Sequence, residues 1–268
     1  MRTKYLIVGN SAGGIGAAET IRQVDKEGAV TIISEDPYPA YSRPLISEYL
    51  ARERTFDGIL FRPLDFYEQN SITFLPGKKV THLELENRTA WLEDNEQIAW
   101  DKLLLAVGGK PIFPKMKGSD KRGVFTFTNL DDAKAVDRFL GNARKAVVIG
   151  GGLIGISVTE ALVKRGVDVT VVEMKERILN TILDRQASLM AEEVLACAGV
   201  EIIAGDTVID INGKGTVEEV VLDNGKAMPC DLVLVTIGVS PRAELALDAE
   251  LRVNRGIVVD HHMATTHP

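Results

Sequence analysis

Short runs of apolar, β-branched residues alternate along the chain with longer runs whose apolar residues recur at helical spacing. The first unit of this kind predicts a strand, a helix and a strand over residues 5–8, 14–25 and 30–34. The second predicts the same three elements over residues 146–149, 153–165 and 167–172. Such alternation is typical of βαβ units and parallel sheets. We therefore expect an α/β protein with two Rossmann-like domains.

The stretch between the two units has a different pattern. Short β-rich runs at residues 71–75, 79–85, 90–92 and 97–100 predict a strand followed by an antiparallel β-meander, and residues 102–107 predict a return to a parallel strand. Gly/Pro-rich breaks at 108–111 and 237–241 indicate crossings between domains. We therefore predict a first domain over 1–112 plus 239–268, with a second domain over 113–238 inserted in it.

A glycine-rich turn joins the strand and the helix of the first unit. Gly9 permits a tight turn and Gly14 lets the helix approach the strand, while the helix N-terminus offers N–H groups to a pyrophosphate. Ser11 stands where the fingerprint has its second glycine. An acid, Glu35, ends the next strand roughly 20 residues on, where a carboxylate can bind ribose hydroxyls. The predicted contacts of this first dinucleotide site are Gly9, Ser11, Ala12, Gly13, Gly14 and Glu35.

The second unit carries a complete G-x-G-x-x-G turn between its strand and helix. Its predicted contacts are Gly150, Gly152, Leu153, Ile154, Gly155 and, at the end of the next strand, Glu173. A carboxylate at that position repels a 2′-phosphate, so NADH is favoured over NADPH. We interpret the nearby Lys175 and Arg177 as solvated surface charges.

Bulk properties exclude several classes of function. The 268-residue chain has a net charge of −7, which disfavours a nucleic-acid partner. It has no run approaching the roughly 20 apolar residues that span a bilayer, and we expect a cytoplasmic protein without a membrane association. We interpret Cys197 and Cys230 as buried structural thiols, and we expect no metal site. No catalytic side chain can be assigned.

Together the two turns and the G-G-x-P break resemble the glutathione-reductase-like superfamily of FAD-dependent pyridine nucleotide-disulfide oxidoreductases, over essentially the whole chain. The resemblance implies that FAD occupies the first site and NADH the second. It also implies cofactor contacts at four further positions, namely Val80, Ala106, Gly108 and Gly238.

Residues 41–47 indicate which branch of the superfamily the chain resembles. Arg43-Pro44 and Ser47 are similar to the R-P-x-x-S segment of NADH reductases that act on rubredoxin, ferredoxin or nitrite reductase, in which the Arg and Pro lie against FAD. Many of these relatives carry a Lys at the position of Glu48 and an acid at the position of Ser157. No cysteine lies between Glu35 and Glu68, so disulfide-reducing chemistry, which requires a thiolate there, is disfavoured.

The resemblance implies hydride transfer from NADH to flavin, and then electron transfer to an external acceptor such as a small redox protein. Two alternatives stay open, an NADH oxidase acting on oxygen and a non-catalytic nucleotide-binding module. Members of the family continue beyond the position of Pro268 into a flavin-contacting strand, a helix and usually a dimerising domain. We therefore expect a fragment of a longer protein that binds FAD weakly or not at all, and a homodimer where the C-terminal domain is present.

Overall fold

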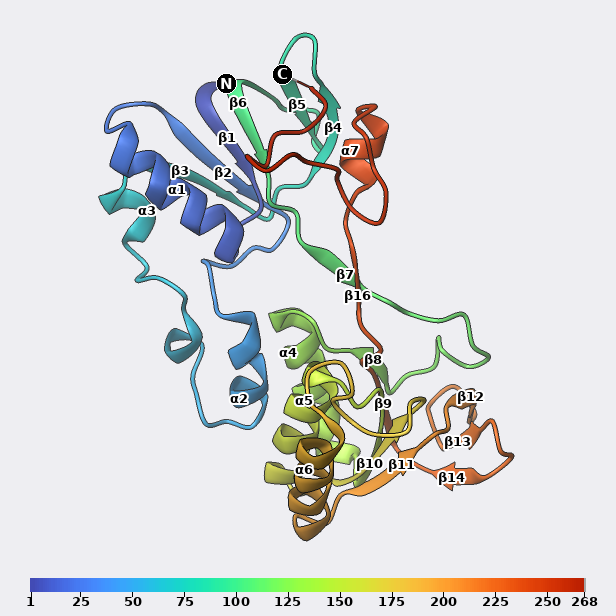
Figure 1. Cartoon of the computed structure of the whole chain (residues 1–268). Helices are drawn as coiled ribbons and strands as arrows, with labels where there is room; N and C mark the ends of the chain where they lie inside the picture. Colours follow the sequence, from blue (N-terminus) through green and yellow to red (C-terminus); the bar gives the residue numbers. More distant parts are fainter. Residues whose placement is uncertain (268) are drawn as a thin grey trace. The chain divides into compact units, whose positions relative to one another are not determined.

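The structure is a computed structural model that describes residues 1–267, apart from the side chain of Asn142; Pro268 lies outside the described residues. The chain forms two compact units (Figure 1). Unit 1 consists of Met1–Ser42, Leu60–Lys110 and the chain from Ser240 on, and unit 2 of Arg43–Ile59 and Pro111–Val239. The sequence-based division differs most at residues 43–59, which it assigned to the first domain, and it places the two later boundaries one or two residues away.

Unit 1 is built on a six-stranded sheet in the order β3-β2-β1-β6-β5-β4. Its strands are β1 (Arg2–Val8), β2 (Val30–Ser34), β3 (Ile72–Pro76), β4 (Val80–Glu84), β5 (Thr89–Leu92) and β6 (Gln97–Leu105). Strands β3, β2, β1 and β6 are parallel, whereas β6, β5 and β4 form the antiparallel meander that the sequence predicts. The strand order reverses between β1 and β6, the kind of position where open α/β sheets bind ligands.

Strand β6 corrects the expectation of two separate strands at 97–100 and 102–107. Its beginning pairs antiparallel with β5, and residues from Ala99 to Leu105 pair parallel with β1. Asp101, which separated the two predicted runs, and Lys102, which began the second, are exposed residues within one continuous strand.

The helices of unit 1 are α1 (Ala12–Val24), α3 (Phe66–Gln69) and α7 (Glu244–Asp248). Helix α1 buries Gly14, Ile15, Ala18 and Arg22, which recur at about one helical turn and face the sheet. Figure 1 shows α1 and α3 on the same face of this sheet. Arg22 is only 9% exposed, and its guanidinium donates to the backbone carbonyls of Asp25, Gly28, Asn70 and Ser71 at 2.5–3.1 Å.

Unit 2 is built on five parallel strands in the order β11-β10-β9-β15-β8. These are β8 (Val124–Thr126), β9 (Lys145–Ile149), β10 (Asp168–Glu173), β11 (Glu201–Ala204) and β15 (Leu232–Val235). Its longer helices are α4 (Leu130–Phe139), followed by the 3-10 turn η3 (Leu140–Asn142), α5 (Leu153–Lys164) and α6 (Arg185–Cys197). The predicted second βαβ unit corresponds to β9, α5 and β10.

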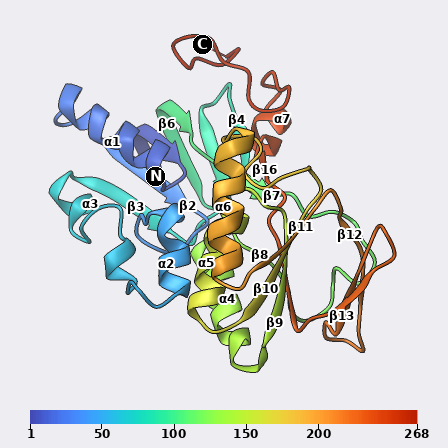
Figure 2. The same ribbon diagram turned by 60° about the horizontal axis from the view of Figure 1, so that its bottom comes forward.

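A second sheet in unit 2 was not predicted from the sequence. Strands β12 (Val208–Asn212), β13 (Glu219–Leu222) and β14 (Ala227–Pro229) form an antiparallel sheet. Its Ile211, Val220 and Met228 share one apolar cluster with Val147 and Val233 of the parallel sheet. The small sheet therefore covers one face, and both views show α5 and α6 on the other (Figures 1 and 2).

Residues 43–59 belong to unit 2 although they lie between β2 and β3 in the sequence. They form η1 (Arg43–Leu45), α2 (Ile46–Leu50) and η2 (Asp57–Ile59), and α2 packs on α4 and α5. Arg165, at the end of α5, donates to the carbonyl of Leu50 at 2.7 Å and pairs with Asp137 of α4. Lys164 pairs with Glu53 at 2.8 Å. Charged side chains thus fasten the end of α2 to the helices of unit 2.

The chain crosses between the units four times, and two of these crossings lie near the predicted breaks. At these two crossings lie β7 (Gly109–Pro111) and β16 (Val239–Pro241), which pair as a two-stranded sheet. Among the described residues, no helix is both long enough and apolar enough to cross a membrane.

Candidate nucleotide-binding sites

The first glycine turn connects β1 to α1 and lies against the residue that follows β6. Gly9 has φ +122°, and a Cβ placed on it would lie 2.1 Å from the carbonyl oxygen of Ala106. A Cβ on Gly14 would lie 1.9 Å from the carbonyl oxygen of Gly9. Both positions therefore require glycine, the first for the turn and the second for the approach of helix to turn.

The second turn, between β9 and α5, is built in the same way. Gly150 has φ +107°, and a Cβ on it would lie 2.7 Å from the carbonyl oxygen of Thr236, the residue that follows β15. A Cβ on Gly155 would lie 1.9 Å from the carbonyl oxygen of Gly150. The two predicted turns thus share the same close contacts, each beside the neighbouring parallel strand.

The helices that follow these turns differ from the other long helices at their N-termini. In α4 the side chain of Asn129 accepts a hydrogen bond from Asp132 N–H, and in α6 Asp184 accepts one from Ala187 N–H. The cap residues of α1 and α5, Ser11 and Gly152, make no such bond, and neither first turn has an acidic residue. The unbonded N–H groups and the positive end of each helix dipole favour an anion there.

The space around Gly152 shows whether the second turn has room for a dinucleotide. A Cβ on Gly152 would meet no protein atom within 4 Å, and its φ of −80° is accessible to any residue. By contrast, a Cβ on Gly151 would lie 2.7 Å from Ile178 Cγ2. The protein itself therefore requires glycine at 151 but not at 152, where the missing side chain leaves open space beside the helix N-terminus. Leu153, the first residue of α5, is exposed and Ile154 is half-buried.

The two acids lie at equivalent positions but have different partners. Glu35 directly follows β2, is exposed, and pairs with Arg242 at 2.6 Å and Lys79 at 3.7 Å. Glu173 ends β10 and is nearly buried; its carboxylate accepts hydrogen bonds from Gly151 N–H at 2.7 Å and Lys175 N–H at 2.8 Å. The backbone therefore fixes the carboxylate of Glu173, whereas that of Glu35 is shared between two cations.

The other predicted contacts lie near the turn of their own unit or at a connection. Ala106 donates its N–H to Val8, and its Cβ lies near Gly13, where a Cβ would meet it at an ordinary 3.7 Å. Val80 begins β4 one residue after Lys79, the partner of Glu35. Gly108 has φ +68° with open space around it, and the carbonyl of Gly238 accepts a hydrogen bond from Ile112.

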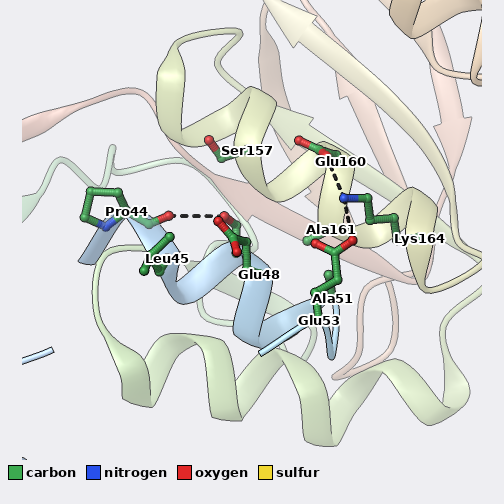
Figure 3. A pocket seen from close by; sticks show the side chains of 10 residues that line it. Pro44, Leu45, Glu48, Ala51, Glu53, Ser157, Glu160, Ala161 and Lys164 are labelled. Atoms are coloured by element: carbon green, nitrogen blue, oxygen red, sulfur yellow. Dashed lines mark hydrogen bonds and ion pairs between the residues drawn. The ribbon is translucent and has the colours of Figure 1, made fainter. Parts of the chain in front are cut away.

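Arg43 and Pro44 lie in unit 2, where Arg43 donates to the carbonyl of Thr128 at 3.1 Å. Pro44 also lines a cavity of about 370 Å³ between α2 and α5 (Figure 3). Glu48 and Ser157, the positions at which the resemblance implies a lysine and an acid, both line this cavity. Its other charged residues are Glu53, Glu160 and Lys164, which are paired with one another through Lys164.

Two side-chain contacts that hold the turns were missed from the sequence. Asn10, in the first turn, accepts a hydrogen bond from the buried Tyr67 hydroxyl at 2.9 Å and donates to the carbonyl of Tyr38. In the second turn, the buried Thr236 hydroxyl lies 3.0 Å from the carbonyl oxygens of Ile149 and Gly150. Asn10 could have been singled out because it directly follows Gly9. Nothing near it in the sequence identifies Tyr67 as its partner.

Two expectations about charged and thiol side chains were wrong. Arg177 is not a solvated surface charge, because its Nε is buried without a hydrogen-bond partner and its Nη2 donates to the carbonyl of Leu183. Cys197 is exposed on α6, whereas Cys230 is buried as expected. His82, His261 and His262 are exposed. Among the residues that the structure describes, no three His, Cys, Asp or Glu could together hold a metal ion.

The two thiols should differ sharply in reactivity. Burial raises the pKa of Cys230 to about 12, aided by the nearby charges of Asp231 and Glu219, so this thiol stays protonated at neutral pH. We expect a thiol reagent at about pH 8 to modify one cysteine in the folded protein and the second only after unfolding. The Cys197→Ser variant is the control and should lose the modification that occurs in the folded protein. Modification of the folded variant would contradict the assignment of Cys197 as the reactive thiol.

A comparison with protein families finds one match over nearly the whole chain. Residues 3–268 match the model of the family described as pyridine nucleotide-disulphide oxidoreductase. The NADH-dependent phenylglyoxylate dehydrogenase subunit epsilon of Aromatoleum evansii is 33% identical over 264 residues, covering 98% of this chain and 63% of that protein.

Proteins that reduce small redox proteins are similarly close. The rubredoxin-NAD(+) reductase of Pseudomonas putida is 32% identical over 263 residues, covering 97% of this chain and 68% of its own length. The reductase in the crystal structure of a covalent putidaredoxin reductase–putidaredoxin complex superimposes with a TM-score of 0.93 at 30% identity, covering 99% of this chain and 66% of that one. The chain thus spans about two thirds of the length of these relatives.

Proposed function

Because the chain belongs to the pyridine nucleotide-disulphide oxidoreductase family, we propose that it is an FAD-dependent oxidoreductase that takes hydride from NADH and passes electrons to an external acceptor. The observation that carries this proposal is the pair of glycine turns with the same close contacts, each followed by a helix whose N-terminus no side chain caps. A pyrophosphate at each N-terminus would accept hydrogen bonds from the free N–H groups.

We assign FAD to the turn at Gly9 and NADH to the turn at Gly150. The fixed carboxylate of Glu173 supports NADH over NADPH, because a carboxylate beside the place where the ribose would lie would repel a 2′-phosphate. The name of the Aromatoleum relative, which includes NADH dependence, points the same way. Glu35 would accept hydrogen bonds from the ribose of FAD, with Arg242 and Lys79 orienting its carboxylate.

The two cofactors supply the hydride chemistry when bound, and the chain supplies position and electrostatics. Ala12, Gly13 and Gly14 offer N–H groups to one pyrophosphate, and Leu153, Ile154 and Gly155 offer them to the other. In the cavity beside α5, Glu48 pairs with Arg54 and Glu160 pairs with Lys164. These two carboxylates are held in ion pairs, so we assign neither a proton-transfer role.

We propose a small redox protein as the acceptor. Two of the relatives named above are a rubredoxin reductase and a reductase in a complex with putidaredoxin. The chain has only two cysteines, Cys197 on α6 and Cys230 before β15, and neither lies in the segment where the disulfide-reducing branches carry their reactive thiol. Electrons would therefore leave the flavin without passing through an internal dithiol.

Incubation of the 268-residue chain with excess FAD tests the proposal, because free flavin must stay present where binding is weak. We expect the difference spectrum of bound flavin, bleaching by NADH under anaerobic conditions and reoxidation by an artificial acceptor. The same assay with NADPH should bleach the flavin at least about ten-fold less efficiently, since the carboxylate opposes the extra phosphate. No spectral change at saturating FAD together with no consumption of NADH would refute the proposal, and rapid oxygen consumption would identify an oxidase instead.

A further inference from the structure

The loop between β10 and α6, residues 174–184, folds back onto the second glycine turn. Leu179 in this 174–184 loop is buried and has φ +52°, a left-handed conformation that costs free energy in a residue other than glycine. Its N–H donates a hydrogen bond to the carbonyl of Gly151 at 2.8 Å. A conformation of this kind persists only where surrounding contacts hold it, so the neighbours of the loop must fix its position.

The 174–184 loop and the acid Glu173 meet at Gly151. Ile178, which is fully buried, fills the space on one side of this glycine, since a Cβ on Gly151 would lie 2.7 Å from Ile178 Cγ2. The N–H of Gly151 donates to one carboxylate oxygen of Glu173 at 2.7 Å, and the N–H of Lys175 donates to the other at 2.8 Å. A shift of the loop would therefore displace both N–H groups that orient this carboxylate.

Helix α6 holds the loop through both backbone groups of one residue. The hydroxyl of Ser188 donates to the carbonyl of Ile178 at 2.9 Å, and the carboxylate of Glu192, about one helical turn later, accepts from the N–H of Ile178 at 3.3 Å. A serine inside a helix commonly bonds to a carbonyl in the preceding turn of its own helix. Ser188 is fully buried and bonds to the loop instead. Its hydroxyl therefore links α6 to the loop that lies on the second turn.

We propose that Ser188 is a positioning residue for the nucleotide at the second turn and that it contributes to the choice of NADH over NADPH. The inference rests on the proposed function, which places NADH at this turn. Ser188 lies outside the turn and acts through the loop residues Ile178 and Leu179. These contact Gly151, whose N–H orients the Glu173 carboxylate. A carboxylate held in place can bind ribose hydroxyls and oppose a 2′-phosphate, whereas a carboxylate free to turn away does both less well.

Removal of the Ser188 hydroxyl tests the inference through a ratio of two affinities. We expect Ser188→Ala to weaken NADH binding about ten-fold in isothermal titration, and NADPH binding less than about two-fold. The preference for NADH should therefore fall at least about five-fold. A merely structural role would weaken the binding of both nucleotides alike, because both use the same turn.

Glu192 provides a second variant, at a half-buried position of the same helix. Glu192→Ala should lower the preference for NADH in the same direction, because the N–H of Ile178 loses its acceptor. Glu192→Gln keeps an oxygen that can accept this bond and should retain the wild-type ratio. Glu193→Ala is the matched control, since it removes the same side chain at the next position, which is exposed, and should bind both nucleotides like the wild type.

The outcomes separate the inference from the function on which it rests. A wild-type ratio of the NADPH and NADH dissociation constants in Ser188→Ala and Glu192→Ala would overturn the inference and leave the second site intact, whether or not both affinities fall. If Ser188→Ala does not fold, the Glu192 variants decide by the same ratio. A wild-type chain that binds neither nucleotide would refute the proposed function, and the role of Ser188 with it.

Discussion

The Gly155→Ala variant should lose NADH affinity by about a hundred-fold and unfold about 3 kcal/mol more easily than the wild type. Its new Cβ would lie 1.9 Å from the carbonyl oxygen of Gly150 and 2.8 Å from Thr236 Oγ1. The first of these is a backbone atom and the second belongs to a buried side chain, so α5 must move away from the turn. That shift misplaces the free N–H groups at the helix N-terminus, on which pyrophosphate binding depends.

Gly152→Ala is the matched control in the same turn. Its Cβ would meet no protein atom within 4 Å and its φ is ordinary, so the free energy of unfolding should change by less than about 1 kcal/mol, because the lost freedom of the unfolded chain and the poorer N-cap propensity of alanine oppose each other. NADH affinity should still fall, because the methyl group occupies the space left for the ligand. Urea unfolding and titration with NADH measure the two effects separately. Wild-type behaviour of Gly155→Ala in both would contradict this account of the second site.

Replacement of Arg22 by Met should reduce the free energy of unfolding by about 3 kcal/mol. The guanidinium is nearly buried and donates to four backbone carbonyls, two in the loop after α1 and two just before β3. One acceptor, Ser71, has φ +49°, a conformation that costs free energy and persists only where neighbouring contacts hold it. Met matches the length of the arginine stem but leaves the carbonyls without donors.

Arg2→Met provides the control for Arg22→Met. Arg2 pairs with Asp101 at 2.9 Å, but its side chain is 77% exposed, so we expect a loss below about 1 kcal/mol. Urea unfolding at low and high salt checks both variants. The effect at Arg22 should persist in high salt because the buried bonds are poorly screened, whereas the effect at Arg2 should vanish. Equal losses for the two variants would show that the carbonyl cluster does not stabilise unit 1.

Local sequence patterns were sufficient to predict the strands and helices that flank the two glycine turns. The predicted strand over residues 30–34 coincides with β2, and the helix predicted from Leu153 begins there. The reason is physical: strand and helix periodicity act over a few residues, and a G-x-x-x-x-G spacing specifies a backbone shape within one turn. Local patterns also explain why β6 was predicted as two strands. Its polar residues interrupt the apolar pattern, whereas its pairing with β1 continues past them.

Contacts between distant residues could not be read from these patterns. The small sheet of unit 2 consists of short strands whose apolar residues are explained only by packing against β9 and β15. Cys197 follows an apolar run on α6, yet it is exposed and only Ser188 of that helix is buried. Arg242 reaches Glu35 from the far end of the chain. None of these partners is defined by spacing along the sequence.

By itself the sequence determined the α/β class, the two glycine turns and an acid after each, because these depend on short-range backbone geometry. The tertiary structure decided that residues 43–59 pack with unit 2 and that both turn helices begin without a side-chain cap. Those features depend on which side chains meet after folding.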